Sequence, residues 1–569
     1  MTTQPSDVEI AQAHLLQPIG EIAAKAGIPA DAVIPYGTTK AKVDITKVDY
    51  SKENQGKLVL VTGVSPTPAG EGKSTVLIGL TDALDQLGKK AIVALREPSQ
   101  GPVMGIKGGA AGGGYAQIVP MEDINLHFTG DFHAITSATN TLAAIIDNHI
   151  HQGNALGIDP RRVTWQRCMD VNDRALRNVV TGLGGPAHGV PAETGFTITA
   201  ASEIMAILCL ATNLEDLKKR LGDITIGFTY DQRPVTARDL NAEGALTALM
   251  RDALNPNLVQ TLGGVPALVH GGPFANIAHG CNSLLATQTA LQFGDIVLSE
   301  AGFGSDLGGE KFVDIKARFG DLDVAGAVVV ATIRSQKYNG GVAKDKLTEE
   351  NLDALKAGIV NLERHVKNLR KFGIKPVVAL NLFWSDTEAE REFMRQWAED
   401  FGVALEEANV WSEGGAGATT LAETLLENLQ GGAKQLYDPR EGIEASIETI
   451  AREIYRADRV EYGAKALKDL KYIQDNGWDK LPVVISKTQY SFSDDASALG
   501  APEGHTLHVR ELLPRTGSGF IVVLTGNVMT MPGLPKNPAA NNIDVDKQGT
   551  ISGLFELAPE SWTGLILGG

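Results

Sequence analysis

Cysteine is scarce in this sequence, and its scarcity narrows the chemistry to be considered. The chain of 569 residues has three cysteines, Cys168, Cys209 and Cys281, which lie far apart and form no C-x-x-C pair. This spacing argues against a disulfide framework and against a cysteine-ligated zinc site, and it fits a reducing compartment. Four histidines also fit no standard metal-site spacing: His127, His133, His270 and His279.

Long apolar runs are also missing. No stretch reaches the length of about 18 consecutive apolar residues that a membrane-spanning helix requires. Residues 1–15 are polar and acidic, and they lack the basic segment and apolar run of a secretory signal. We therefore expect a cytoplasmic protein with no membrane partner.

Basic residues are outnumbered by acidic ones. Lysine and arginine total 51 against 68 aspartates and glutamates, which gives a formal net charge of −17. Such a charge argues against nucleic acid as a partner, because an acidic protein repels a polyanion. The general acidity serves solubility. An anionic substrate must nevertheless be met by positive charge concentrated in its binding site.

Apolar runs rich in valine, isoleucine and leucine alternate with helical patterns along the chain. This alternation is typical of an α/β fold, in which ligands bind at the carboxyl ends of parallel strands. A charged helix over 349–372 is expected to bridge two domains, and the segment 531–542 is expected to be a loop because it is rich in proline and asparagine. The predicted strands are 57–62, 91–95, 267–270, 296–298, 327–332, 377–382 and 522–525.

A glycine-rich loop lies between the first predicted strand and a predicted helix over 74–87. It departs from the pattern G-x-x-x-x-G-K-[ST] at its first position, where Thr67 replaces glycine. Backbone amides and the helix N-terminus bind phosphates, Lys73 reaches the β- and γ-phosphates, and Ser74 offers a hydroxyl to Mg²⁺. The sequence therefore predicts an ATP site. The predicted nucleotide-binding residues are Thr67, Pro68, Ala69, Gly70, Glu71, Gly72, Lys73, Ser74 and Thr75.

The loop and the alternating pattern together predict the architecture. We expect an α/β protein with a P-loop NTPase-like parallel sheet in a large N-terminal domain and two smaller α/β domains. The predicted boundaries are 1–365 for the nucleotide-binding domain, 366–478 for a small domain and 479–569 for the C-terminal domain.

Arg96 ends the next predicted strand, which places it beside the phosphate loop in a parallel sheet. A second cation at this position suits an anionic co-substrate or the γ-phosphate. An ordinary ion pair with Glu97 or Asp131 is the alternative. We predict Lys73 and Arg96 as the catalytic cations, and we take His270 as a further candidate because it ends another strand.

A second glycine cluster, Gly105–Tyr115, is more unusual than the phosphate loop. Such a run cannot pack a core, so it forms a loop held by its neighbours or by a ligand, or else a flexible hinge. This cluster and five other motifs resemble the formate–tetrahydrofolate ligase family, and the resemblance extends from about residue 10 to the C-terminus. The motifs are Arg96–Pro102, Gly105–Tyr115, Asn125–His133, Asn172–Arg177, Val269–Ser283 and Glu300–Gly308.

The resemblance implies a reaction and its site residues. ATP, formate and tetrahydrofolate would give 10-formyltetrahydrofolate, ADP and phosphate through formyl phosphate, in a homotetramer activated by a monovalent cation, K⁺ or NH₄⁺. Phe383 and Trp411 are implied to stack on the folate, and Glu97 and Asp131 to help bind the monovalent cation or to orient Arg96. Ala275 and Ser305 complete the implied nucleotide site.

Four positions depart from the pattern that we associate with the family. Ser335 and Gln336 stand where alanine and leucine are usual, and Ala192 and Thr197 stand where arginine and aspartate are usual. These departures concern details of substrate or subunit contacts and leave the reaction class unchanged.

Two other readings of the phosphate loop stay open on the residues alone. A carboxylate-phosphorylating ligase resembling dethiobiotin synthetase would need neither the second glycine cluster nor the aromatic pair. A ParA-like partitioning ATPase would need a DNA or membrane surface, which the net charge of −17 disfavours. An NAD site is not expected, because no G-x-G-x-x-G follows a strand.

Overall fold

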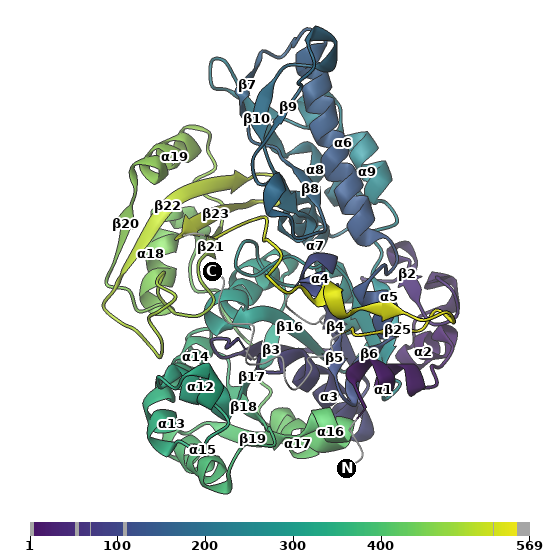
Figure 1. Ribbon diagram of the computed structural model, residues 1–569, viewed down its shortest axis with the longest axis vertical. Coiled ribbons are helices and arrows are strands. Elements are labelled where there is room, and N and C mark those ends of the chain that lie inside the picture. The colour runs from purple at the N-terminus through teal and green to yellow at the C-terminus, as the bar shows by residue number, and fades with distance from the viewer. Residues whose placement is uncertain (1–4, 52–55, 69, 106–110, 527, 555–569) are drawn as a thin grey trace.

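The computed structural model describes residues 5–51, 56–68, 70–105, 111–526 and 528–554 (Figure 1). A twelve-stranded sheet forms its centre. Within it, a series of strands from β15 to β19 is parallel, each strand to the next. The predicted α/β class and mostly parallel sheet are confirmed. In spatial order the parallel strands are β15 (Pro266–Val269), β4 (Ala91–Leu95), β16 (Ile296–Gly304), β3 (Lys57–Gly63), β17 (Val324–Ala331), β18 (Pro376–Asn381) and β19 (Ala404–Ala408).

Antiparallel strands extend the sheet beyond β15. The strand β14 pairs with β15, β2 and β6 in antiparallel register, and β1 and β5 pair with β2 and β6. This side of the sheet is therefore antiparallel. Its strands are β14 (Asn257–Thr261), β2 (Ala41–Val43), β1 (Val33–Pro35), β6 (Ala116–Val119) and β5 (Gly112–Gly113).

Helices cover both faces of the parallel strands. Along β3, Leu58 and Leu60 belong to one apolar core and Val59 and Val61 to another, as the two-residue period of a strand requires. A strand that is apolar at every position is thus buried on both sides. On the first face lie α2 (Ile19–Ala26), α10 (Leu284–Phe293), α14 (Val360–Lys371) and α15 (Glu388–Phe401), and on the second face lie α3 (Lys73–Gln86) and α17 (Thr419–Glu427).

The predicted charged helix over 349–372 is wrong in its continuity and in its role. The structure has two helices there, α13 (Leu352–Gly358) and α14, and α14 buries Leu362, Val366 and Leu369 in the core. A β-carbon on Gly358 would lie 1.7 Å from the backbone oxygen of Gln336, so this glycine permits a close approach of the chain. The segment packs on the sheet instead of bridging two domains.

Residues 376–408 extend the main sheet through β18 and β19, which continue the parallel series beyond β17. The predicted boundary after residue 365 stays a prediction, although strands on its two sides pair in one sheet. The short elements at the carboxyl edge are α4 (Gln100–Met104), α5 (Met121–Asn125), α12 (Ile333–Asn339), α16 (Val410–Glu413) and the π-helical turns Ser305–Gly309 and Phe312–Ala317.

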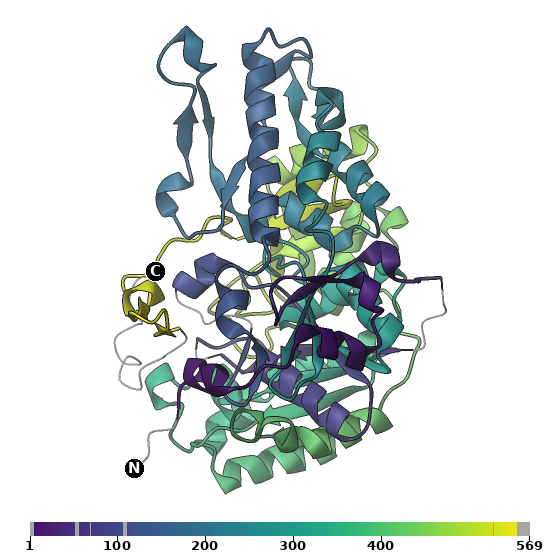
Figure 2. The same cartoon turned by 90° about the vertical axis from the view of Figure 1, so that its right-hand side faces the viewer.

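A lobe whose helices and strands are not among those predicted from the sequence projects from the sheet. The long helix α6 (Asp131–His151) runs along it in both views (Figure 2). A separate core holds its helices against a three-stranded sheet. The other elements are α7 (Glu203–Leu210), α8 (Leu214–Gly222), α9 (Glu243–Met250), β7 (Ile158–Val163), β12 (Thr225–Thr229) and β13 (Pro234–Thr236), with the two-stranded pairs β8 (Arg167–Met169)/β11 (Phe196–Ile198) and β9 (Val179–Thr181)/β10 (Ala192–Thr194).

A four-stranded sheet forms the C-terminal unit, in the order β20, β22, β23 and β21. Along the chain, β20 lies between α18 and α19. The segment 531–542 is mainly loop, as predicted, and ends in a short 3₁₀ turn over Ala539–Asn542. The elements are α18 (Ile443–Glu453), β20 (Arg459–Tyr462), α19 (Ala464–Asp475), β21 (Val483–Ser486), β22 (Thr506–Arg515), β23 (Phe520–Thr525), β24 (Asp544–Val545) and β25 (Ile551–Ser552), and α1 (Asp7–Ala13) and α11 (Arg318–Gly320) complete the chain.

Candidate active site

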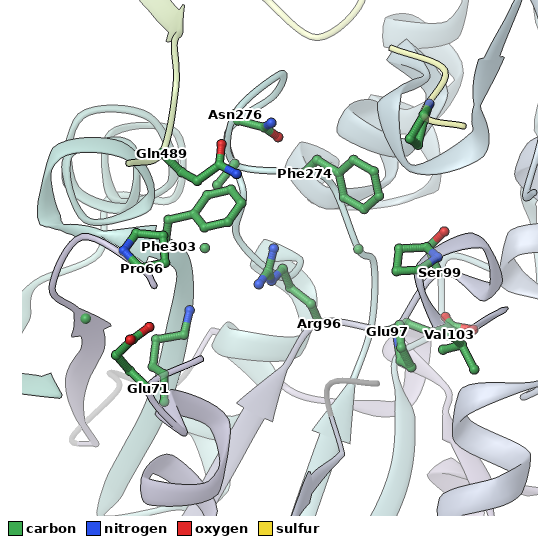
Figure 3. Close-up of a pocket in the computed structure, with 18 of the residues that line it drawn as sticks. Pro66, Glu71, Arg96, Glu97, Ser99, Val103, Phe274, Asn276, Phe303 and Gln489 are labelled. Carbon is green, nitrogen blue, oxygen red and sulfur yellow. The ribbon is translucent and has the colours of Figure 1, made fainter. Parts of the chain in front are cut away.

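A cavity of about 460 Å³ lies at the carboxyl ends of β3, β4 and β16. Figure 3 shows Arg96 directed toward the space between Phe274 and Phe303. Asn172 contributes to its wall from the lobe and Gln489 from the C-terminal unit. The cavity therefore lies where three parts of the chain meet, at the edge where a parallel sheet binds ligands.

The phosphate loop joins β3 to α3 at the floor of this cavity. Gly72 is the N-cap of α3 with a φ of +69°, and a β-carbon there would lie 2.4 Å from Nδ2 of Asn381. The backbone amide of Thr67 lies 3.2 Å from the Glu71 carboxylate, and its hydroxyl donates to that carboxylate at 2.7 Å. Threonine in place of the first glycine thus adds a donor that holds the loop. Ala69 lies outside the described residues.

Glu300 is the acidic centre of the site, although it is not among the site residues predicted from the sequence. Its carboxylate is fully buried in the middle of β16 and accepts a hydrogen bond of 3.0 Å from the Ser74 hydroxyl. Nζ of Lys73 lies 3.6 Å from one carboxylate oxygen and Nε of Arg96 lies 3.7 Å from the other. Two cations and a hydroxyl, from the start of α3 and from the residue after β4, therefore converge on one carboxylate.

Burial and charge act in opposite directions on this group. Burial would raise the pKa of Glu300, but the cations Lys73 and Arg96 and the hydrogen bond from Ser74 hold it below its usual value. Burial lowers the pKa of Lys73 to about 8, and Arg96 adds to that decrease while Glu300 opposes it. The cluster therefore keeps the buried Glu300 carboxylate ionised, and it brings the pKa of Lys73 down toward neutral pH.

A signal for Glu300 was present in the sequence. The residues Ser299–Gly302 follow an apolar run, and a carboxylate at that place in a parallel sheet faces the ligand edge. The predicted strand ended at Leu298, whereas β16 continues to Gly304 and pairs with β3 through Glu300. The shorter strand left the direction of the Glu300 side chain undetermined.

Arg96 lines the cavity as predicted for a residue beside the phosphate loop. Its ion-pair partner is Glu300, and neither Glu97 nor Asp131 takes that place among the ion pairs of the described residues. Its guanidinium also donates to the backbone oxygen of Pro273 at 3.3 Å. A β-carbon on Gly302 would lie 3.1 Å from the Arg96 Nη1, so that glycine leaves room for the guanidinium.

Glu97, the residue after Arg96, and Asp131, the first residue of α6, form a buried carboxyl pair that takes no part in the ion pair of Arg96 with Glu300. Asp131 binds Nζ of Lys42 at 2.8 Å and accepts from Nδ2 of Asn257 at 2.7 Å. Burial raises the pKa of Glu97 well above its usual value, and the charge of Asp131 raises it further. Within the described part of the chain, Oε2 of Glu97 has no hydrogen-bond partner.

Ala275 lines the cavity, whereas Ser305 is fully buried behind it. The Ser305 hydroxyl lies 2.8 Å from Nδ1 of His365, and Nε2 of the same ring lies 3.1 Å from the hydroxyl of Ser65. Because the backbone amide of Ser305 donates to Nδ1 of His365, the proton of the neutral ring is on Nε2. His365 thus joins the phosphate loop to the end of β16.

The two predicted folate-stacking aromatics lie at the ends of adjacent strands. Phe383 follows β18 and Trp411 lies in α16 after β19, and β18 and β19 are parallel with Asn381 opposite Ala408. Neither aromatic is among the described residues that line the 460 Å³ cavity. They lie on the same sheet edge, further along it than the phosphate loop, and Trp411 is 38% exposed.

Trp411 packs against the second glycine cluster. The Trp411 backbone oxygen accepts from the amide of Tyr115 at 2.8 Å, and a β-carbon on Gly114 would lie 2.7 Å from Cγ of the indole. The carboxylate of Asp7 binds the amide of Gly114 at 2.7 Å and the Trp411 side chain. This part of the cluster is therefore a support for Trp411, while residues 106–110 lie outside the described part.

His270, which the sequence offered as a candidate catalytic residue, is a buried structural residue. Its Nδ1 lies 2.6 Å from the hydroxyl of Ser283 and its Nε2 lies 2.6 Å from the backbone oxygen of Ala253. Burial lowers its pKa to about 4, so the ring is neutral. In the described part of the chain, no group of three or more histidine, cysteine, aspartate or glutamate side chains is arranged to hold a metal ion.

The four departures from the family pattern lie away from the cavity lining. Ser335 forms a capping box with Thr332 at the start of α12, and the side-chain oxygen of Gln336 accepts from the backbone amide of Leu362 at 3.2 Å. Ala192 and Thr197 lie in β10 and β11 of the lobe. Among the described helices, none has the length and apolar composition for crossing a membrane.

Comparison with known proteins gives one consistent result. A family model described as formate--tetrahydrofolate ligase matches residues 5–555. A protein of that name from Corynebacterium jeikeium (strain K411) is 69% identical over 563 residues, which cover 97% of this chain and 98% of the relative. Its namesake from Corynebacterium diphtheriae is 70% identical over 552 residues, 97% of this chain and 100% of the relative. A protein of the same name from Staphylococcus aureus (strain JH9) is 60% identical over 555 residues, which cover 97% of this chain and 100% of the relative.

Proposed function

This chain belongs to the formate–tetrahydrofolate ligase family and is a ligase, and we propose that it uses ATP to join formate to N10 of tetrahydrofolate. The observation that carries the ATP-dependent part is the convergence of Lys73, Arg96 and Ser74 on buried Glu300 beside the phosphate loop. These groups supply concentrated positive charge in a protein of net charge −17. Such a site suits the transfer of a phosphoryl group to a small carboxylate.

The proposed chemistry has two steps because formate is a poor acyl donor. A formate oxygen attacks the γ-phosphorus, the bond from that phosphorus to the ADP oxygen breaks, and formyl phosphate forms. N10 of tetrahydrofolate then attacks the formyl carbon, phosphate leaves with the bonding electrons, and N10 loses its proton. Phosphate is a far better leaving group than oxide, so the phosphorylation makes the acyl transfer feasible.

The first step brings two anions together, and the cations at the cavity floor oppose their repulsion. Lys73 at the start of α3 would neutralise the β- and γ-phosphates, and Arg96, which lines the cavity, would face formate. Both cations are oriented in advance by Glu300, so little reorganisation is needed at the moment of transfer. Removing one such electrostatic group costs about 3–4 kcal/mol of barrier in comparable sites.

The oxygen atoms around Ser74 fit the requirements of Mg²⁺. The Ser74 hydroxyl and the Glu300 carboxylate lie 3.0 Å apart, and Oε1 of Glu300 has no hydrogen-bond partner among the described residues. Hydroxyl and carboxylate oxygens are the hard donors that this ion prefers, usually together with substrate phosphates. When bound, Mg²⁺ would neutralise phosphate charge, and Ser74 and Glu300 would hold it.

We propose that folate binds at the part of the sheet edge that carries Phe383 and Trp411, which we call the aromatic end. Phe383 and Trp411 end adjacent parallel strands, and planar rings stack favourably on such side chains. The pterin held there would direct N10 toward the formyl group at the other end of the edge. This is the charged end, where Lys73, Arg96 and Glu300 lie. A proximity effect of this kind replaces a bimolecular encounter by a positioned one.

We also propose a monovalent-cation site and a homotetrameric assembly. The buried pair Glu97 and Asp131 supports a site for a monovalent cation, because such an ion would add to the charge of Lys42 in relieving the repulsion between the two carboxylates. The family resemblance supports a homotetramer. A cytoplasmic location stays a prediction from the sequence.

An assay that omits each substrate in turn tests this function. The protein is incubated with Mg²⁺, ATP, formate and tetrahydrofolate, and both ADP and 10-formyltetrahydrofolate are measured. We expect equal amounts of the two products and no product when any substrate is left out. ADP release that is independent of formate and tetrahydrofolate would contradict the proposal.

A further inference from the structure

Arg334 lies between the charged end and the aromatic end of the sheet edge. It is the second residue of α12, directly after β17, and β17 is the strand between β3 and β18. Its guanidinium carbon lies 3.5 Å from the centroid of the Phe383 ring. This is close cation–π contact, which holds a ring on one face and leaves its other face for a planar ligand.

Two acidic side chains next to Arg334 connect it to both ends of the edge. Burial lowers the pKa of Arg334, while the charges of Glu71 and Asp386 favour its protonated form. Asp386 accepts a hydrogen bond of 2.8 Å from the backbone amide of Phe383, so it fixes the chain that carries the ring. Glu71 belongs to the phosphate loop.

Glu71 divides its interactions between the loop and the β18 end of the sheet. Its carboxylate accepts from the Thr67 hydroxyl at 2.7 Å, and its backbone oxygen accepts from Nδ2 of Asn381 at 2.9 Å. Asn381 is the last residue of β18, two residues before Phe383. The loop that binds phosphate therefore reaches the folate-stacking ring through a backbone contact and through the charge of Arg334.

We propose that Arg334 is a positioning residue that couples occupation of the phosphate loop to the folate-binding face of Phe383. Nucleotide phosphates bring negative charge to the loop and compete with the Glu71 carboxylate for its donors. The displaced carboxylate then pairs with Arg334, which holds the guanidinium more firmly on Phe383. By thermodynamic linkage, tetrahydrofolate must favour nucleotide binding by the same factor.

The inference rests on the proposed stacking of folate at Phe383, and binding measurements test it. The dissociation constant of tetrahydrofolate is measured by calorimetry with and without a non-hydrolysable ATP analogue and Mg²⁺. In the intact enzyme we expect the analogue to tighten tetrahydrofolate binding at least about fivefold, the lower end of typical coupling. Arg334→Met should abolish this tightening, and Arg334→Lys should restore part of it, because lysine keeps the charge without the planar contact.

A matched control comes from another arginine stacked on a phenylalanine. The Arg370 guanidinium carbon lies 5.2 Å from the Phe401 ring, away from the cavity lining, and Arg370→Met should retain the full tightening. Glu71→Gln removes the charge at the other end of the proposed link and should also abolish it. This second variant decides the matter if Arg334→Met does not fold.

Phe383→Ala separates failure of the inference from failure of the proposed function. If Phe383→Ala leaves tetrahydrofolate affinity unchanged, the stacking itself is wrong and the inference falls with it. If Phe383→Ala weakens binding but Arg334→Met and Glu71→Gln keep the tightening by nucleotide, only the coupling is overturned. Absence of any tightening in the intact enzyme would also overturn it.

Discussion

The two ends of one sheet edge in this protein carry opposite kinds of chemistry. At one end, Arg96 follows β4, Glu300 lies within β16 and the loop of Lys73 follows β3, and these charged groups are largely buried. At β18 and β19 the strands end in Phe383 and Trp411, which offer flat apolar rings. The same backbone arrangement thus serves phosphate transfer at one end and ring stacking at the other, and the side chain after each strand decides which.

The difference also shows in how each end is held. The charged end is fixed by ion pairs and hydrogen bonds to a single buried carboxylate, so removing one member leaves an uncompensated charge. The aromatic end is fixed by packing of Trp411 on glycine backbone and by contacts from Asp7 and Arg334. We therefore expect mutations at the first end to abolish turnover and mutations at the second to weaken folate binding.

Removal of Lys73 should have the largest effect. Lys73→Ala should lower kcat by about 10²–10³-fold, because it removes one of the two cations that face the transferred phosphoryl group. The affinity for tetrahydrofolate, measured by calorimetry, should stay nearly unchanged. Lys471 is exposed in α19 and is a matched control, so Lys471→Ala should leave both quantities unchanged. Equal loss of folate binding in Lys73→Ala would show that the two ends are not separable.

The titration of Lys73 should give the next largest effect. Because burial lowers its pKa to about 8, the amine is charged below that pH and neutral above it. The value of kcat/KM for ATP, which reports the free enzyme, should therefore fall as pH rises through about 8.

Glu300→Gln sharpens this pH prediction. The charge of Glu300 raises the pKa of Lys73, so its loss should move the fall in kcat/KM to lower pH. The kcat/KM for tetrahydrofolate at saturating ATP should show a smaller shift. A profile for ATP that stays flat from pH 7 to pH 9 in the intact enzyme would contradict the role of Lys73.

Trp411→Ala should have the smallest effect on the reaction as a whole. Loss of the ring should raise the KM for tetrahydrofolate about tenfold, corresponding to roughly 1.4 kcal/mol of stacking. The KM for ATP should change by less than about twofold, because the phosphate loop lies at the other end of the edge. An equal increase in both KM values would mean that Trp411 supports the whole site instead of the folate alone.

The charged end was more predictable from sequence than the aromatic end. The strand over 57–62, the glycine loop and the helix from residue 74 all lie within one local segment, and β3 and α3 begin and end within one residue of the prediction. Local patterns suffice there, because strand, loop and helix are consecutive. Glu300 was missed because the predicted strand ended at Leu298 and because its role depends on β16 lying beside β3, which is a long-range pairing.

Other parts of the fold depended on long-range contacts in the same way. In place of the helix predicted over 349–372 the chain forms α13 and α14, and Gly358 at the end of α13 lies against Gln336 of α12, a contact between separate helices. The partners of Arg96 and Phe383, namely Glu300 and Arg334, lie roughly 200 and 50 residues away in the sequence. Such pairs follow from the strand order, and a single sequence does not determine that order.

Positional isotope exchange tests most directly whether the charged end phosphorylates formate without the aromatic end. ATP labelled with ¹⁸O in the bridge between the β- and γ-phosphates is incubated with the enzyme, Mg²⁺ and formate, in the absence of tetrahydrofolate. We predict that the label moves into the non-bridging β-phosphate positions only when formate is present, and that Trp411→Ala exchanges at a similar rate. Exchange that requires tetrahydrofolate, or that is lost in Trp411→Ala, would contradict the account.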